Sequence, residues 1–437
     1  MSTALDTYTT ELLDSLYTET AEQNSPTAKQ QKEVNILLAK AEQSEATAPI
    51  IAFFKMLKEM HDDFNISSRD FDISRDRLSE IALKHQDIDE HMVSVGGRVG
   101  QALAIADEAN ERVEEYLSRK DTEAASGIEL WDQILEHQQR IKTTLGMRDD
   151  EWNSFSGQIR HAVKSVDDLA ELIDLPADAV ADIARVTKNY RMRLTPYYTS
   201  LIMPGEVNDP IMLQAVLTGE MVDNAGVEIP PVAADHSPAR LVDQFYPRVV
   251  TIKSTNMCAM YCTHCLRIAH IGKKDKMFSK AAYNEALDYI RANEQIRDVL
   301  ITGGDAFVLS NFMLRWLLEQ VDSIEHVKLK RLGTRVPVTV PMRVDDELLD
   351  ILEESNERKP LRVVTQINTA REITPVSRKA FKDISGRVFA VLNQAVLLRG
   401  INDSKVKMWK LCETIQEAYV RPYYIFNCSY RNPQFVH

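Results

Sequence analysis

Cysteine is scarce in this sequence, with five residues among 437, and three of the five lie within eight positions, at 258, 262 and 265. So uneven a distribution excludes a disulfide framework and indicates a metal site in a reducing compartment. Long apolar runs are also missing, since none approaches the roughly 20 residues of a membrane helix. The N-terminal residues have neither the basic start nor the apolar stretch of a secretory signal. We therefore expect a cytoplasmic protein with no membrane span.

Positive charge is the second deficit. The chain has 52 lysines and arginines against 65 aspartates and glutamates, a formal net charge of -13. Without a local basic patch in the sequence, this balance excludes a broad nucleic-acid surface or an anionic-membrane surface. Hydrophobic residues make up 44% of the chain and charged residues 27%, as in ordinary globular proteins. The length predicts two or three domains.

The sequence pattern divides the chain into three parts. Residues 1–130 are acidic, with apolar residues at helical spacing, and predict a helical extension. It is either an arm for partner binding or oligomerisation, or an extension packed on the body. Residues 131–245 predict further helices and then a proline-rich connector. Residues 246–437 alternate short β-rich runs with helical segments, which is typical of parallel β/α units.

The third part predicts an α/β fold, a partial barrel of six β/α units. Chemistry in such a barrel belongs at the carboxyl ends of the strands. The expected strands are 249–254, 298–302, 328–334, 361–366, 388–393 and 421–427, and the expected helices are 279–293, 310–321, 345–355, 375–384 and 404–418.

Cys258, Cys262 and Cys265 follow the first expected barrel strand directly. Three thiolates at this spacing suit one 4Fe-4S cluster and leave its fourth iron without a protein ligand. A zinc site is the alternative, although structural zinc normally has four protein ligands and His264 is poorly placed beside Cys265. A second alternative is an electron-transfer cluster with a fourth thiolate from Cys412 or Cys428.

The cysteine loop and several further segments resemble one enzyme family in order. The loop, Thr255–Arg267, places Met-Tyr between its first two cysteines and ends Cys-x-His-Cys, as in the lysine 2,3-aminomutase family of radical S-adenosylmethionine (SAM) enzymes. The glutamate 2,3-aminomutase branch also has an acidic helical extension, and the resemblance covers roughly 131–437. Further matching blocks are Leu194–Tyr198, Ser200–Ile202, Asn208–Pro210, Asp298–Asp305, Arg331–Arg335, Asn393–Asp403 and Arg421–Ile425.

This resemblance implies a function and its cofactors. The open iron of the 4Fe-4S cluster would bind SAM, and the reduced cluster would split SAM to a radical that takes hydrogen from the substrate. Pyridoxal 5'-phosphate (PLP) would hold the substrate amine while it moves from the α-carbon to the β-carbon, which makes the expected enzyme an isomerase. The implied partners are a small amino-acid substrate, a flavodoxin or ferredoxin as electron donor, and further copies of the chain in a homo-oligomer.

The resemblance also assigns residues to these cofactors. Gly303, Gly304 and Asp305, after the second barrel strand, and Gln394, near the end of the fifth, match residues that contact SAM. Arg267 matches an arginine that binds the substrate α-carboxylate by a bidentate fork. Beyond the cluster cysteines, no catalytic residue is assigned.

The sequence departs from the family pattern in four places. Gln366 and Thr369 stand where the family has histidines, one of which approaches SAM, so Gln366 supplies that hydrogen bond or the bond is absent. Arg248 lies one residue from the position of the arginine for the PLP phosphate. Ser429 replaces the charged residue that selects the substrate, an aspartate in lysine mutases and a lysine in the glutamate branch, which leaves the amino acid undecided and disfavours lysine. The resemblance to the glutamate branch favours a glutamate-like substrate.

The fourth departure concerns PLP itself. The family's PLP lysine lies beyond the last barrel strand, in a segment this chain does not contain. The chain is then a C-terminally truncated form, or a family member without this lysine that runs another radical reaction. A non-enzymatic protein stabilised by a cluster or zinc is the remaining reading.

Overall fold

The protein was analysed as a computed structural model, which describes residues 15–17, 25–84, 97–188, 191–219, 221, 237–265, 274–276 and 278–428. The chain divides into two compact units, Met1–Glu115 and Tyr116–His437. Within the described ranges, no helix combines the length and apolar character needed to cross a membrane.

The first unit is helical and has a core of its own. Its elements are α2 (Ala28–Gln43), α3 (Thr47–Phe64), the 3-10 turn η1 (Ser68–Phe71), α4 (Arg75–Lys84) and the start of α6 (Gly97–Glu123). Helix α2 begins at a capping box between Thr27 and Gln30, and its buried residues Val34, Leu38 and Ala41 recur at helical spacing. They pack with Phe53 and other apolar residues of α3, so this unit buries apolar surface without help from the barrel.

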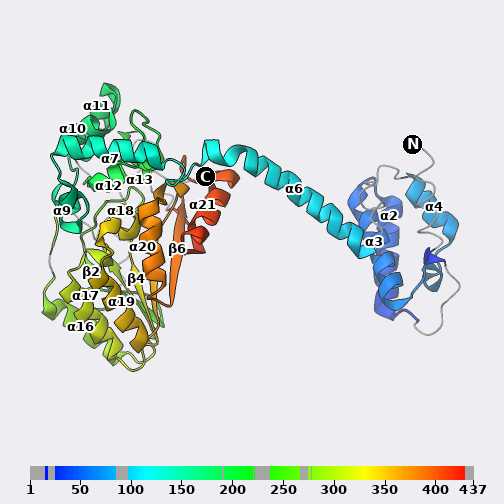
Figure 1. Ribbon diagram of the computed structural model, residues 1–437. Helices are drawn as coiled ribbons and strands as arrows, with labels where there is room; N and C mark the ends of the chain where they lie inside the picture. Colours follow the sequence, from blue (N-terminus) through cyan, green and yellow to red (C-terminus); the bar gives the residue numbers. More distant parts are fainter. Residues whose placement is uncertain are drawn as a thin grey trace. The chain divides into compact units, whose positions relative to one another are not determined.

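The second unit begins with short helices. They are α7 (Trp131–Leu145), α8 (Asp149–Trp152), α9 (Phe155–Arg160), α10 (Val166–Ile173), α11 (Ala177–Thr187), α12 (Pro196–Thr199) and α13 (Met212–Ala215). Tyr197 and Tyr198 of α12 are fully buried. The Tyr197 hydroxyl bonds the Thr374 hydroxyl at 2.6 Å, and Thr195 donates to the carbonyl of Thr339. These helices therefore lie on the loops at the carboxyl ends of the barrel strands (Figure 1).

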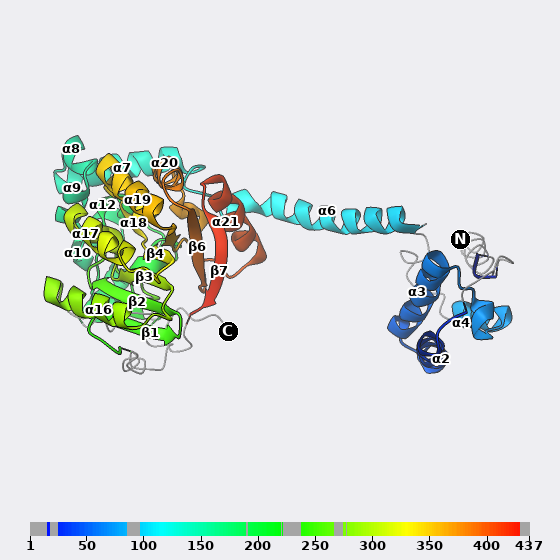
Figure 2. The same ribbon diagram turned by 90° about the horizontal axis from the view of Figure 1, so that it is seen from below.

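A curled seven-stranded sheet forms the body of this unit (Figure 2). Its strands follow one another in chain order: β1 (Val242–Tyr246), β2 (Val249–Thr255), β3 (Asp298–Gly303), β4 (Leu329–Gly333), β5 (Leu361–Thr365), β6 (Ala390–Leu397) and β7 (Arg421–Asn427). Strands β2 to β7 are parallel, and β1 is antiparallel to β2. The six parallel strands confirm the predicted partial barrel. Strand β1 was not predicted, because its residues fell within the presumed connector.

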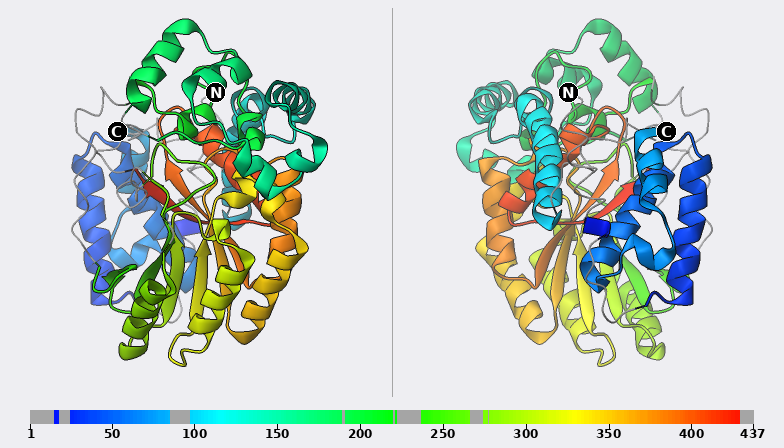
Figure 3. Two further views of the ribbon diagram at one scale, coloured as in Figure 1. Left: turned by 90° about the vertical axis from the view of Figure 1, so that its left-hand side faces the viewer. Right: turned by 90° about the vertical axis from the view of Figure 1, so that its right-hand side faces the viewer.

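The helices between the strands cover one face of the sheet (Figure 3). The longer ones begin at a side chain that caps the first turn, Ser279 for α16 and Asp345 for α19. They are α16 (Lys280–Ala292), α17 (Asn311–Asp322), α19 (Asp346–Arg358), α20 (Pro375–Ser385) and α21 (Lys405–Glu417), with α18 (Val336–Thr339), η2 (Ala306–Val308), η3 (Pro341–Arg343) and η4 (Ala370–Glu372) in the loops. Their apolar stripes and the strands share one continuous core.

A buried lysine in this layer predicts a pH dependence of stability. Lys330 is fully buried in β4, pairs with the Asp322 carboxylate and donates to the Ser355 carbonyl at 2.8 Å. Burial lowers the pKa of Lys330 to about 8, against the opposing effect of Asp322. In the unfolded chain the pKa of a lysine is near 10.4. Between pH 8 and about pH 10.4 the side chain is therefore protonated in the unfolded state and largely neutral in the folded state. The free energy of unfolding should therefore gain up to about 3 kcal/mol between pH 8 and pH 10.5.

Urea unfolding at these two pH values, in the protein and in a Lys330→Met variant, measures this contribution. The variant keeps Asp322 paired with Arg358, whose Nε donates to the carboxylate at 2.9 Å. We expect the stability of the unsubstituted protein to rise with pH relative to that of the variant. Equal changes in the two proteins would contradict the prediction.

Candidate active site

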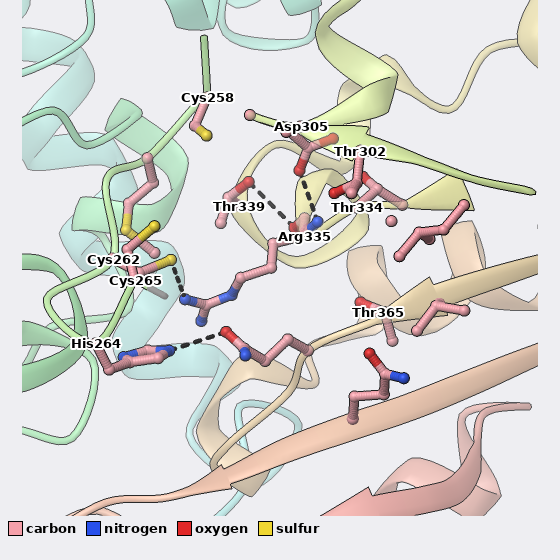
Figure 4. A pocket seen from close by; sticks show the side chains of 18 residues that line it. Cys258, Cys262, His264, Cys265, Thr302, Asp305, Thr334, Arg335, Thr339 and Thr365 are labelled. Carbon is pink, nitrogen blue, oxygen red and sulfur yellow. Dashed lines mark hydrogen bonds between the residues drawn. The ribbon is translucent and has the colours of Figure 1, made fainter. Parts of the chain in front are cut away.

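A cavity opens at the carboxyl ends of the strands, between the barrel and the helices before it. Its empty space, including the open mouth, is about 900 Å³. Its walls come from the loop after β2 and from the ends of β3, β4, β5 and β6 (Figure 4). The residues lining it are Cys258, Met260, Cys262, His264, Cys265, Leu300, Thr302, Gly303, Gly304, Asp305, Gly333, Thr334, Arg335, Thr339, Val364, Thr365, Gln366 and Gln394.

The cysteine loop is held by the helical segment that precedes the barrel. The Thr263 amide donates to the Gln214 carbonyl at 2.9 Å, and its hydroxyl donates to the Leu213 carbonyl at 2.8 Å. At the start of the loop, Arg193 donates through Nη1 to the Cys258 carbonyl at 3.1 Å. The backbone is therefore fixed from outside, and the three thiols lie on one wall of the cavity (Figure 4).

The thiol arrangement fits a cubane cluster better than a single metal ion. Among the described residues, no three histidine, cysteine or acidic side chains converge as they would around one ion. Each thiolate of a three-cysteine cubane binds a different iron, so its sulfurs lie farther apart. Burial raises the pKa of the Cys258 thiol, and the Asp305 carboxylate adds to this effect. A thiolate there needs positive charge nearby, which bound iron supplies.

Neither of the remaining cysteines is a candidate for a fourth thiolate. Cys412 is half-buried in α21, and Cys428 is buried just beyond β7 against Val396, Leu398 and Ile401. Both lie outside the cavity lining. The geometry therefore fits a cluster with one iron free of protein ligands.

A buried arginine reaches the cysteines from the opposite wall. Arg335, just after β4, donates through Nη1 to Cys262 Sγ at 2.9 Å and through Nη2 to Glu372 Oε1 at 2.5 Å. Glu372 is fully buried and also accepts from the Tyr198 hydroxyl at 3.0 Å and from the Asn368 amide at 2.8 Å. This network holds the guanidinium where it donates to a thiolate and offsets its negative charge.

His264 does not face the thiols. Its Nε2 bonds Gln366 Oε1 at 2.9 Å, and burial lowers its pKa to about 3, so the ring is neutral (Figure 4). Within the described part of the chain, three buried atoms of the cavity lining have no hydrogen-bond partner: His264 Nδ1, Arg335 Nε and Thr365 Oγ1. An unpaired buried polar group costs about 1–3 kcal/mol. These atoms therefore suit a polar ligand.

The glycines after β3 join that strand to the cysteine loop. The Gly304 amide donates to the Thr255 carbonyl at 2.5 Å, and the Asp305 amide donates to the Met257 carbonyl at 2.9 Å. A Cβ on Gly304 would lie 2.2 Å from that Met257 oxygen. Gly303 has a φ of 111°, which favours glycine. The sequence predicts that these glycines let a ligand come close to the backbone. In the structure, Gly304 also lets the backbone of the cysteine loop come close.

A substitution at Gly304 tests this close approach. Gly304→Ala should push the cysteine loop away from β3 and cost about 1–3 kcal/mol, because the clashing atoms are backbone. Gly386→Ala is the matched control, since a Cβ there meets its nearest atoms at 3.6 and 3.9 Å. Thermal unfolding of both variants measures the difference. Equal stability of the two would contradict this account of Gly304.

Asp305 faces the cavity with both oxygens already bonded to the backbone. Oδ1 accepts from the Phe307 amide at 2.9 Å, and Oδ2 accepts from the Arg335 amide at 2.6 Å. Burial raises the pKa of Asp305, against hydrogen bonds from Thr334 and these amides that lower it. These hydrogen bonds fix the carboxylate at the cavity wall.

Eight of the predicted site residues line this one cavity: Cys258, Cys262, Cys265, Gly303, Gly304, Asp305, Gln366 and Gln394. Arg248 does not. It precedes β2 and lies with Glu294, Arg297, Glu325, His326 and Lys328 around a separate surface depression. The seven residues of β2 span roughly 20 Å, so a PLP phosphate in the cavity is beyond the reach of Arg248. Arg267 and Ser429 lie outside the described residues.

Sequence reasoning did not find the Arg335 network. Arg335 ends a family-like block directly after a barrel strand, and that position is a signal that was available. Glu372 and Gln214 gave no such signal, because only the fold brings them to Arg335.

Residues 252–409 match the radical SAM superfamily. The chain is 36% identical over 330 residues to glutamate 2,3-aminomutase of Clostridioides difficile (strain 630), covering 75% of this chain and 77% of that protein. It is 36% identical over 283 residues to L-lysine 2,3-aminomutase of Clostridium subterminale, covering 64% and 67%. The corresponding enzyme of Methanococcus maripaludis is 36% identical over 303 residues, covering 68% and 69%.

Proposed function

The chain belongs to the 2,3-aminomutase family of radical SAM isomerases, and we propose that it moves the α-amino group of an amino acid to the β-carbon. One observation carries this proposal: three thiols lie on one wall of a cavity at the carboxyl ends of the strands. Opposite them lie an acid and an arginine, and three buried polar atoms of the described lining have no partner, which suits a charged cosubstrate and a small substrate.

We assign Cys258, Cys262 and Cys265 as the ligands of a 4Fe-4S cluster. Such a cluster with SAM on its open iron supplies one-electron cleavage of SAM and, through it, abstraction of hydrogen from the substrate. Arg335 donates to Cys262 and partly neutralises its sulfur, while Glu372 holds the guanidinium in place.

We assign the end of β3 and the loops beside it to SAM. Asp305 accepts from the methionine ammonium, and Gln366 and Gln394 present amide groups from the ends of β5 and β6. The unpaired His264 Nδ1 and Thr365 Oγ1 gain partners when this ligand binds. The protein's contribution is to orient the reacting groups and to keep water out of the cavity.

The described residues do not fit PLP. The part of the lining that the structure describes contains no lysine to carry it, and Arg248 lies outside the cavity. The experiment below tests whether the protein uses PLP.

We favour a glutamate-like substrate over lysine. Asp305 is the one carboxylate in the described lining, and it is assigned to SAM, so nothing there opposes the distal ammonium of lysine. Ser429 stands where the charged residue for substrate selection is expected. Identity to the glutamate enzyme extends over 75% of the chain, against 64% for the enzyme from Clostridium subterminale.

Anaerobic reconstitution with iron and sulfide tests the proposal. We expect a brown protein that, with dithionite and SAM, releases 5'-deoxyadenosine. With PLP added, incubation with glutamate should yield the β-amino acid, and incubation with lysine should not. No chromophore or no 5'-deoxyadenosine would refute the radical SAM site. SAM cleavage without any β-amino acid from a panel of α-amino acids would instead favour a family member with another radical reaction.

A further inference from the structure

A group of cations surrounds the outer side of the cysteine loop. Arg191 and Arg193 precede α12 in the chain, and Lys274 and Lys276 flank Asp275. We call these four cations the basic patch. The two guanidinium groups lie over the Tyr261 ring, 4.5 and 5.1 Å from its centroid.

Hydrogen bonds tie the basic patch to the cysteine loop. Asn256 Nδ2 donates to the Lys274 carbonyl at 2.9 Å, and its Oδ1 accepts from the Lys276 amide at 2.8 Å. Asn256 lies two residues before Cys258, so the two lysines are held beside the start of the loop. Arg193 donates to the Cys258 carbonyl at 3.1 Å, which gives the patch a hydrogen-bonded connection to a cluster ligand.

The patch is positive on a chain that is otherwise acidic. Its one internal acid, Asp275, bonds Arg191 at 2.6 Å, Arg193 at 2.8 Å and the Tyr261 hydroxyl at 2.9 Å. These hydrogen bonds lower the pKa of Asp275 to about 2 although burial opposes them, so it stays ionised. Four cations and one anion leave a local charge of +3 on a chain of net charge -13. Lys274 and Lys276 are exposed, and 24% of the Arg191 side chain is accessible.

We propose that the basic patch is the docking surface for an acidic electron-carrier protein that reduces the cluster. This inference rests on the proposed function, because it requires a cluster on Cys258, Cys262 and Cys265. One electron leaves the carrier and enters the cluster, and no atom or proton is transferred. An acidic carrier is repelled by most of this chain, and a positive area beside the cluster steers it to the productive face.

A second group of cations provides a control surface for the basic patch. Arg248, Arg297 and Lys328 lie with Glu294 and Glu325 at the amino end of β2, where three cations and two acids nearly cancel. That surface is a strand length of roughly 20 Å from the cysteine loop. It therefore serves as the control surface.

The experiment compares two charge-reversed variants of the reconstituted protein. Lys274→Glu combined with Lys276→Glu alters the patch, and Arg248→Glu combined with Lys328→Glu alters the control surface. Purified flavodoxin in its hydroquinone state is the probe, and the bleaching of the cluster is followed by stopped-flow absorbance at low and high salt. Binding of oxidised flavodoxin is measured in parallel by calorimetry.

We expect the patch variant to be reduced at least about 10-fold more slowly by flavodoxin at low salt, and to bind it more weakly, with both differences shrinking as salt rises. Reduction by dithionite, a small anion, should change far less, and the control variant should match the unsubstituted protein. Equal flavodoxin rates in both variants, or an equal slowing of flavodoxin and dithionite reduction in the patch variant, would overturn the inference. A chain that forms no cluster would refute the proposed function instead.

Discussion

Replacing Cys262 by alanine should abolish cluster assembly and SAM cleavage while leaving the chain folded. Cys262 is the thiol to which Arg335 donates, and it lines the cavity with Cys258 and Cys265. With two thiolates left, a cubane loses one of its three protein ligands. Iron should fall from about four per chain to below about one. Formation of 5'-deoxyadenosine should drop by more than the 10- to 100-fold typical of changes around a metal ligand.

Cys412→Ala is the matched control, because this thiol lies in α21 outside the cavity lining. Iron analysis and 5'-deoxyadenosine formation should match those of the unsubstituted protein. Loss of the cluster in this control would revive the alternative of a fourth thiolate. Circular dichroism of both variants shows whether either loss reflects unfolding.

Replacing Glu372 by glutamine should both destabilise the protein and disturb the cysteine site. The substitution leaves the Arg335 guanidinium buried without its anion, which costs about 3–5 kcal/mol. It also weakens the bond that holds Arg335 against Cys262. Urea unfolding of the cluster-free chain measures the first effect, and a redox titration of the reconstituted cluster, followed by electron paramagnetic resonance, measures the second.

The double variant Arg335→Met with Glu372→Gln distinguishes pairing from packing. If the two side chains act as a pair, the double variant loses less stability than the sum of the single variants. Its cluster should resist reduction more than that of the unsubstituted protein, because the sulfur no longer accepts from a cation. The network would only fill space if the stability lost in the double variant equalled the sum of the losses in the single variants. The reduction potential of the cluster would then also be the same in every variant.

Most of the barrel was predictable because strands β2 to β6 are largely buried and the helices between them are amphipathic. Ile252, Ile301 and Val363 belong to short apolar runs between helical patterns, and the ends of the corresponding strands agree with expectation within one or two residues. Strand β1 was not predictable in this way. It pairs along one edge and exposes Phe245 and Tyr246, so its apolar residues do not mark a buried strand.

The cavity was predictable only in part. Cys258 was found from the cysteine spacing after a strand, and Asp305 was assigned from the family resemblance. Both line one cavity because a parallel barrel brings the carboxyl ends of its strands together. Gln214 and Glu372 come from segments more than 150 residues apart, and one arginine joins them. No local pattern in the sequence encodes such a meeting. Arg248 is a different case, because it precedes the expected strand 249–254 and its place at the amino end, away from the cavity, could be read from the sequence.

The hydrogen bonds from Thr263 to Leu213 and Gln214 determine where this protein can be divided. Homology to the superfamily begins at residue 252, which suggests that the barrel is a portable module. It is not, because Thr263, in the loop that carries the thiols, bonds residues about 50 positions earlier in the chain. A graft or a truncation that begins at β2 would keep every cysteine and lose the support that aims them. The smallest transferable unit of this chemistry therefore includes α12 and α13.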